Sequence, residues 1–146
     1  MIENFEKAFK LLMKLEGYAS NLPGDPGGDT ILGVTSKFYP DVYAELKSAL
    51  TPDKTIPIAK NFYYKEFWLR YNCDMLPDKI DILYFVTAVN TPRGMKSAQI
   101  TGVGSLREEA FEVIDYYVRN SKIFPYGLVK RILRVDEYLR TGTFTI

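Results

Sequence analysis

Histidine is absent from this 146-residue chain, and cysteine occurs once, as Cys73. The lack of histidine excludes Ser-His and Cys-His nucleophilic machinery, acid–base catalysis by imidazole, and every metal site with a histidine ligand. A single cysteine excludes an intrachain disulfide and a cluster of thiolate zinc ligands. Acid–base chemistry in this chain therefore depends on carboxylates, with Lys, Tyr or water as minor options. We expect neither a metal nor a cofactor.

A charge imbalance and a long apolar run are also missing. The 19 basic and 18 acidic residues leave a net charge of +1, so no bulk electrostatic attraction to nucleic acid or anionic membrane is expected. No segment approaches the ~20 apolar residues of a membrane-spanning helix, and acidic residues among the first six positions are atypical of a signal peptide. The length and the 47% hydrophobic content predict one globular domain over residues 1–146.

Apolar residues at spacings of three and four dominate most of the chain, which predicts helices. The opening helix is expected over residues 2–15, and a buried central helix over residues 78–89. The other expected helices cover residues 41–50, 55–71, 92–100, 105–120 and 126–140. Thr55 is expected to cap the helix over 55–71, and Ser105 to Glu108 match a capping box at the start of a later helix.

Glycine and proline concentrate between the first two helices, over residues 17–33. Asp25-Pro26-Gly27-Gly28 is typical of a turn, because Pro fixes φ at the second position and Gly supplies positive φ at the third. Residues 30–35 fit a short strand, so we interpret the segment as an irregular β-hairpin or loop. The predicted fold class is mainly α (α+β), a helical domain with a small β excursion near the N-terminus.

Two carboxylates are candidates for chemistry here: Glu16 directly precedes this segment, and Asp25 lies within it. The unpaired carbonyls at a helix C-terminus disfavour a negative charge, and partial burial acts in the same direction, so we expect a raised pKa for Glu16. Asp25 lies in a polar turn and is expected to stay ionised. Cleavage of a glycosidic bond needs such a pair, one group to protonate the leaving oxygen and one to activate water or stabilise the oxocarbenium ion. The same residues also fit a solvated helix end followed by a turn without chemistry.

Residues 16–35 resemble the signature of glycoside hydrolase 108-type muramidases of phages and prophages, which belong to the lysozyme-like superfamily. Their pattern is Glu-Gly-Gly-Tyr, a short loop, then Asp-Pro-Gly-Gly-x-Thr-x-x-Gly-Ile. The matching positions here are Glu16, Gly17, Asp25, Pro26, Gly27, Gly28, Thr30, Gly33 and Val34. Residues 62–68 resemble the family's Tyr-Lys-x-Tyr-Trp helix, and residues 85–90 its Phe-Asp-x-Ala-Val-Asn segment. Tyr18 and Val86 depart from the pattern, and a wall-binding element typical of the C-terminal part is not found.

The resemblance implies a lysozyme-like fold and an endolysin that hydrolyses β-1,4 bonds between N-acetylmuramic acid and N-acetylglucosamine. It implies that Glu16 is the general acid. Carried over from T4-type phage lysozymes, Asp25 would be the water-activating base and Thr30 the water-positioning hydroxyl. The expected partner is the glycan strand of bacterial peptidoglycan, bound in a groove between the β excursion and the helices.

Four further residues are candidate contacts to the glycan: Tyr18, Tyr64, Trp68 and Asn90. Aromatic rings stack well on the apolar faces of pyranoses, yet rings at helical spacing more often fill a core, and we give the core the larger weight. Asn90 precedes a helix break, where its amide would bind an N-acetyl group or cap the next helix. Tyr18 replaces a glycine beside Glu16, which would place a ring at the mouth of the cleft.

The expected setting is the host cytoplasm before lysis, with release to the cell wall by a holin, or packaging in a virion. Two other functions stay open. A lytic transglycosylase would use a single Glu and leave an anhydro-sugar end. A catalytically inactive lysozyme fold would serve as a wall-binding or virion structural protein, and the departure at Tyr18 and the missing wall-binding element keep this alternative open.

Overall fold

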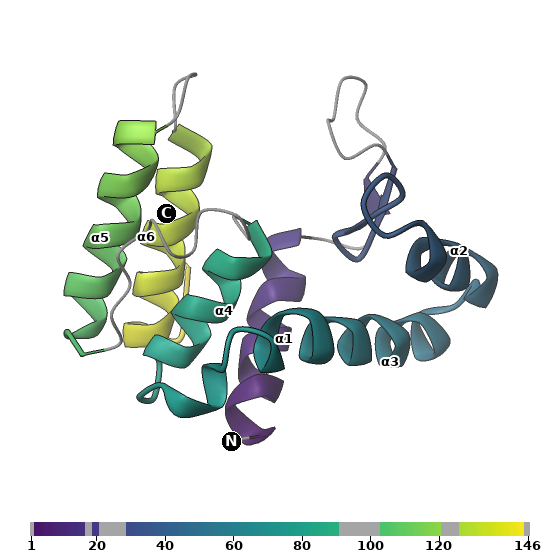
Figure 1. Cartoon of the computed structure of the whole chain (residues 1–146), viewed down its shortest axis with the longest axis horizontal. Helices are drawn as coiled ribbons and strands as arrows, with labels where there is room; N and C mark the ends of the chain where they lie inside the picture. The colour runs from purple at the N-terminus through teal and green to yellow at the C-terminus, as the bar shows by residue number, and fades with distance from the viewer. Residues whose placement is uncertain (1, 17–18, 21–28, 91–102, 121–125, 145–146) are drawn as a thin grey trace. The chain divides into compact units, whose positions relative to one another are not determined.

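A computed structural model of the chain describes residues 2–16, 19–20, 29–90, 103–120 and 126–144. These residues form six α-helices and a three-stranded antiparallel sheet, with one π-helical and one 3₁₀ segment (Figure 1). The predicted class, mainly α with a small β excursion after the first helix, is confirmed and is consistent with a lysozyme-like fold. Among the described residues, no helix has the length and apolar character to cross a membrane.

The observed elements follow the predicted order. Their bounds are α1 Ile2–Glu16, β1 Ala19–Ser20, β2 Thr30–Ile31, β3 Val34–Thr35, α2 Pro40–Ala49, α3 Pro52–Tyr63, the π-helix η1 Tyr64–Leu69, the 3₁₀ segment η2 Cys73–Met75, α4 Ile80–Asn90, α5 Leu106–Asn120 and α6 Tyr126–Thr141. The helix expected over residues 92–100 lies outside the described part of the chain.

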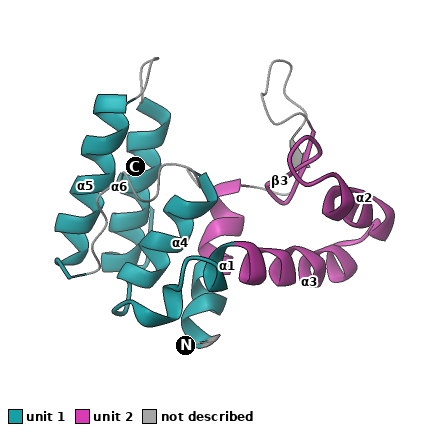
Figure 2. Ribbon diagram, viewed as in Figure 1, with its two compact units in different colours: residues 1–8, 67–146 teal, residues 9–66 magenta. Residues whose placement is uncertain are grey.

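The chain divides into two compact units, drawn in different colours in Figure 2. Unit 1 contains residues 1–8 and 67–146, and unit 2 contains residues 9–66. The boundaries fall inside α1 and inside η1, so continuous helical segments connect the two units. The single domain predicted over residues 1–146 stays a prediction.

The sheet of unit 2 is built around a tight hairpin. Thr30 pairs with Thr35 and Ile31 with Val34, so β2 and β3 are joined by the two residues Leu32 and Gly33. Both have positive φ, 52° and 80°, as in a type I′ turn, whose twist suits a two-residue hairpin. Residues 30–35 were expected to form one short strand, but they form the two strands and the turn of a regular hairpin, because Leu32 and Gly33 reverse the chain.

Helix α3 begins before the predicted residue. Thr51 has extended backbone angles (φ −127°, ψ 147°) as the N-cap residue, and Pro52 occupies the first turn. Proline fits that position because its φ is already helical and no partner for an N–H is needed. Thr55 is buried, and its hydroxyl donates to the carbonyl of Pro52 at 3.5 Å. The predicted cap at Thr55 is therefore wrong.

A π-helical segment, η1, continues α3 where a regular helix was expected. Four aromatic residues near this junction are almost fully buried: Phe62, Tyr63, Phe67 and Trp68. They form two pairs five residues apart. A π-helix closes its hydrogen bonds over five residues, which brings such pairs nearer to one side than an α-helix does. We attribute the π geometry to the burial of these four rings.

Three aromatic rings form the centre of unit 1. Phe5, Trp68 and Phe85 contact one another edge to face, with centroids 5.5 Å (Phe5–Trp68), 5.8 Å (Phe5–Phe85) and 5.7 Å (Trp68–Phe85) apart. Such geometry stabilises ring pairs by about 0.5–1.5 kcal/mol beyond the effect of burial. Helix α4, predicted to be the buried central helix, contributes Phe85, and eight of its eleven residues are buried.

A polar cluster accompanies this core. The Asn4 side-chain amide donates to Asp78 at 3.0 Å and to Asp81 at 2.8 Å, and the Asp81 carboxylate also accepts the Ile82 amide at 2.7 Å. Burial raises the pKa of Asp81 despite these hydrogen bonds. Burial also raises the pKa of the Cys73 thiol to about 12, helped by the nearby negative charges of Asp81 and Asp74. Cys73 is fully buried, and a buried thiol with a raised pKa is a poor nucleophile.

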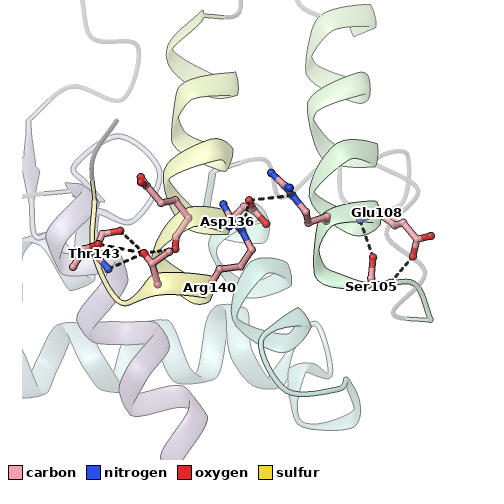
Figure 3. A network of polar contacts seen from close by, with 8 residues as sticks. Ser105, Glu108, Asp136, Arg140 and Thr143 are labelled. Carbon is pink, nitrogen blue, oxygen red and sulfur yellow. Dashed lines mark hydrogen bonds and ion pairs between the residues drawn. The ribbon is translucent and has the colours of Figure 1, made fainter.

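Helices α5 and α6 lie side by side in unit 1 (Figure 1). The predicted capping box opens α5, because Ser105 N–H donates to the Glu108 carboxylate at 2.6 Å and Glu108 N–H donates to the Ser105 hydroxyl at 3.3 Å (Figure 3). Between the helices, the buried Asp136 of α6 faces Arg107 of α5 at 3.8 Å and accepts from Arg140 at 3.0 Å. This charge network connects the two helices.

Candidate active site

Glu16, the predicted general acid, is the last residue of α1. Helix α1 is amphipathic, and its buried residues are Asn4, Phe5, Ala8, Phe9, Leu11 and Leu12. Glu16 ends this helix with a side chain that is neither fully buried nor fully exposed. A carboxyl group in that position can rest on protein on one side and meet a solvent-borne ligand on the other.

The side chain of Glu16 packs against the hairpin turn at Gly33. A Cβ atom placed on Gly33 would lie 3.0 Å from Glu16 Cγ and 3.4 Å from Glu16 Cβ. It would also lie 2.6 Å from the hydroxyl oxygen of Tyr63, closer than real Cβ contacts come. With its positive φ as well, the position requires glycine for two independent reasons. The missing side chain of Gly33 leaves the space that the stem of Glu16 occupies.

Tyr63 of α3 stabilises the same turn through a hydrogen bond. Its hydroxyl donates to the carbonyl oxygen of Leu32 at 2.8 Å, and the whole residue is only 1% exposed. The ring is held by Phe62, at 5.1 Å between centroids, and by Phe9 of α1, at 6.2 Å. The turn against which Glu16 packs is thus hydrogen-bonded to a buried tyrosine.

Thr30, the predicted water-positioning residue, belongs to the same hairpin. It lies in β2 and pairs with Ser20 of β1 and Thr35 of β3. Residues that pair directly across two strands share one face of the sheet, so Thr30 and Thr35 lie on the same face. The structure therefore brings Glu16 to the hairpin that carries Thr30.

Three other predicted site residues belong to unit 2. Asp25, the predicted base, and Tyr18, a predicted glycan contact, lie outside the described residues. Tyr64 begins η1 and is partly exposed. Its role in glycan binding stays a prediction.

Trp68 and Asn90, the candidate contacts of unit 1, both have structural partners. Trp68 is fully buried, and its indole N–H donates to Asp74 at 2.8 Å. This burial favours the core role that the helical spacing of the aromatic residues also indicated. Asn90, at the exposed end of α4, donates through its side-chain amide to the hydroxyl of Tyr117 in α5 at 3.3 Å. A glycan contact by Asn90 stays a prediction.

A cavity of about 530 Å³ lies between α2 and α3 within unit 2. Its wall includes the Tyr39 and Phe62 rings, which meet edge to face at 4.7 Å, with Glu45 and Lys65 among the polar residues. None of the predicted site residues lines this cavity. Among the described residues, no three His, Cys, Asp or Glu side chains gather as ligands for a metal ion.

Comparison with known proteins identifies the class of the protein. Residues 9–91 match the family model described as glycosyl hydrolase 108, which is more than half of the chain. The chain therefore belongs to the glycosyl hydrolase 108 family, and it is a glycoside hydrolase by family. The match covers all of unit 2 and continues through α4. No curated protein and no solved structure matches the chain significantly.

Sequence reasoning did not find the part that Tyr63 plays. In the sequence, Tyr63 is one of several aromatic residues within one predicted helix, and no local signal separates it from its neighbours. Its hydroxyl contacts a carbonyl 31 positions earlier in the chain, which only tertiary packing can establish. Gly33 did carry a signal, because it matches the glycine of the family signature, but that match does not reveal the contact with Glu16.

Proposed function

We propose that this glycoside hydrolase is a muramidase of the endolysin type, which hydrolyses β-1,4 bonds between N-acetylmuramic acid and N-acetylglucosamine in peptidoglycan. Family membership supports the reaction class. The observation that carries the proposal for Glu16 is its position at the end of α1, partly exposed and packed against the Gly33 turn. A proton donor must combine a defined position with access to substrate, and the packing and partial exposure of Glu16 support this role.

In the proposed mechanism Glu16 starts as the carboxylic acid. It donates its proton to the glycosidic oxygen as the bond to the anomeric carbon breaks, and positive charge develops on the sugar. Asp25 would activate the attacking water, and the Thr30 hydroxyl would orient it. A separation of roughly 6.5–9.5 Å between the Glu16 and Asp25 carboxyl groups would give inversion at the anomeric carbon, and about 5–5.5 Å would give retention.

The proposed biological setting follows from the resemblance to phage and prophage enzymes. The protein would be made in the host cytoplasm and reach the wall through a holin, or it would be carried in a virion. Its partner would be the glycan strand of the wall, with Tyr18, Tyr64 and Asn90 as candidate contacts.

Purified bacterial cell walls provide the test. The wild-type protein should clear a wall suspension, and mass spectrometry of the products should find N-acetylmuramic acid at new reducing ends. Glu16→Gln should abolish clearing while still binding to walls, because the amide keeps the shape of the side chain but has no acidic proton. Glu3→Gln is the matched control, since Glu3 lies on the exposed side of the same helix and should clear walls normally.

Two results would replace the proposal by one of its alternatives. Products that end in anhydro-muramic acid would identify a lytic transglycosylase. Binding of the wild-type protein to walls without clearing would identify a wall-binding or virion structural protein.

A further inference from the structure

The strongest unassigned feature near Glu16 is the hydroxyl of Tyr63. It donates to the Leu32 carbonyl at 2.8 Å, in a position where Tyr63 is only 1% exposed. The carbonyl belongs to the first residue of the hairpin turn, and a Cβ placed on the next residue, Gly33, would lie 3.0 Å from Glu16 Cγ. The same hydroxyl oxygen lies over the vacant Cβ position of Gly33. One buried oxygen atom thus borders both the turn and the space that Glu16 fills.

The turn needs this support because its first residue has an unfavourable conformation. Leu32 has a φ of 52°, a region in which residues with a Cβ pay a steric cost and which hairpins normally fill with Asn, Asp or Gly. Leu32 is held there by two contacts. Its side chain is buried, with 4% exposed, and its carbonyl oxygen accepts the hydroxyl of Tyr63. Removal of the hydroxyl would leave a buried carbonyl without that donor in a turn that is already strained.

We infer that Tyr63 is a positioning residue for Glu16: its hydroxyl holds the Leu32–Gly33 turn as the surface against which the Glu16 side chain is oriented. Tyr63 does not touch the reacting atoms, because it is buried and its proton is used by Leu32. This inference rests on the proposed function for its catalytic consequence. The geometric part, that Tyr63 determines where the Glu16 side chain lies, stands without it.

The catalytic test is Tyr63→Phe, which removes one oxygen and keeps the ring that packs on Phe9 and Phe62. With peptidoglycan fragments as substrate, kcat should fall at least about tenfold with little change in KM, because a small displacement of a catalytic group slows the chemical step more than binding. The measurement is made at a temperature where circular dichroism shows the variant fully folded. Tyr43→Phe is the matched control, since it removes a hydroxyl from α2 in the same unit and should leave kcat unchanged.

The geometric test uses nuclear magnetic resonance and needs no activity. In Tyr63→Phe the resonances of the Glu16 Cγ methylene group should shift, and the amides of residues 30–36 should exchange with solvent at least about tenfold faster relative to those of α2. Tyr43→Phe should change neither. Unchanged Glu16 resonances in Tyr63→Phe would overturn the inference, and so would a wild-type kcat in an active enzyme. A wild-type protein that releases no reducing ends would refute the proposed function alone, and the resonance measurement would still decide the role of Tyr63.

Discussion

The two units use their predicted site residues in opposite ways. In unit 2, Glu16 ends a helix, stays partly exposed and packs on a hairpin turn. The Tyr63 hydroxyl stabilises this turn by a hydrogen bond to the Leu32 carbonyl. In unit 1, Trp68 is buried among aromatic rings, and Asn90 is hydrogen-bonded to Tyr117. Among the described candidates, Glu16 combines partial exposure with a fixed support, whereas Trp68 fills the unit 1 core and Asn90 is an exposed residue held by a hydrogen bond to Tyr117.

This difference predicts that stability and activity respond to different parts of the chain. A substitution that creates a cavity in the unit 1 core should strongly lower the free energy of unfolding. It should leave the activity of the molecules that remain folded unchanged. A change at the unit 2 turn should cost less stability and more activity. The variants below test this contrast, in order of their expected effect on stability.

Phe85→Ala should have the largest effect. Phe85 is fully buried and contacts both Phe5 and Trp68, so its truncation should lower the free energy of unfolding by about 3–5 kcal/mol. Denaturant titration can follow this through the fluorescence of Trp68, the only tryptophan of the chain. Below the unfolding transition, wall-clearing activity per folded molecule should equal that of the wild type. A proportionally larger loss of activity would show that the unit 1 core also determines the site.

Gly33→Ala should cost less stability and more activity. The new Cβ would approach the Tyr63 hydroxyl and Glu16 Cγ, and the positive φ would become strained, which together should lower the free energy of unfolding by about 1–3 kcal/mol. Activity on walls should fall at least about tenfold, since Glu16 must move away from the new methyl group.

Gly127→Ala is the matched control for this substitution. Gly127 lies in α6, where a Cβ would meet no atom within 4 Å, so alanine should raise the free energy of unfolding by about 0.4–1 kcal/mol. Thermal denaturation of both variants measures the contrast. Equal effects at the two glycines would refute the close packing described at Gly33.

Ser105→Ala should lower the stability least among the three destabilising variants. It removes the hydroxyl that accepts the Glu108 amide at the start of α5, which should lower the free energy of unfolding by about 0.5–2 kcal/mol. The hydrogen bond from the Ser105 backbone amide lowers the pKa of Glu108, so this carboxylate stabilises the folded state above its unfolded pKa, and the effect is lost as the pH falls through its folded pKa.

Chemical denaturation at pH 7 and at lower pH checks this pH dependence. The loss of stability on acidification should be smaller in Glu108→Gln than in the wild type, because the glutamine side chain does not titrate. An equal loss in the two proteins would contradict the assignment of the titrating group.

The elements with a strong local signal could be predicted from the sequence. The apolar spacing located α1, α4, α5 and α6 within a few residues, and the Ser105–Glu108 pattern located a cap that the structure contains. Glycine-rich turn chemistry predicted the hairpin, and carboxylate placement together with the family signature made Glu16 a candidate, which stays a prediction. These patterns involve residues near one another in the chain, so they can be interpreted without knowledge of the tertiary contacts.

The features that tertiary packing decides could not be predicted. Helix α3 begins at Pro52 and not at the predicted Thr55, because a proline suits the first turn of a helix. The segment η1 is a π-helix and not the expected regular helix, at a place where aromatic rings five residues apart are buried. Leu32 adopts a positive φ that its residue type disfavours, because Tyr63 and the core hold it. Whether an aromatic residue faces a sugar or a core, as for Trp68, likewise depends on contacts distant in the sequence.

The rate at which reducing ends appear in purified peptidoglycan tests the central claim most directly. With a glutamine in place of the proton donor, the initial rate should fall by at least about 100-fold, since a general acid contributes roughly 10²–10⁴-fold to such a reaction. The thermal midpoint should stay close to that of the wild type, and Glu3→Gln should keep the full rate. A Glu16→Gln variant that releases reducing ends at the rate of the wild type would contradict the assignment of Glu16 as the acid.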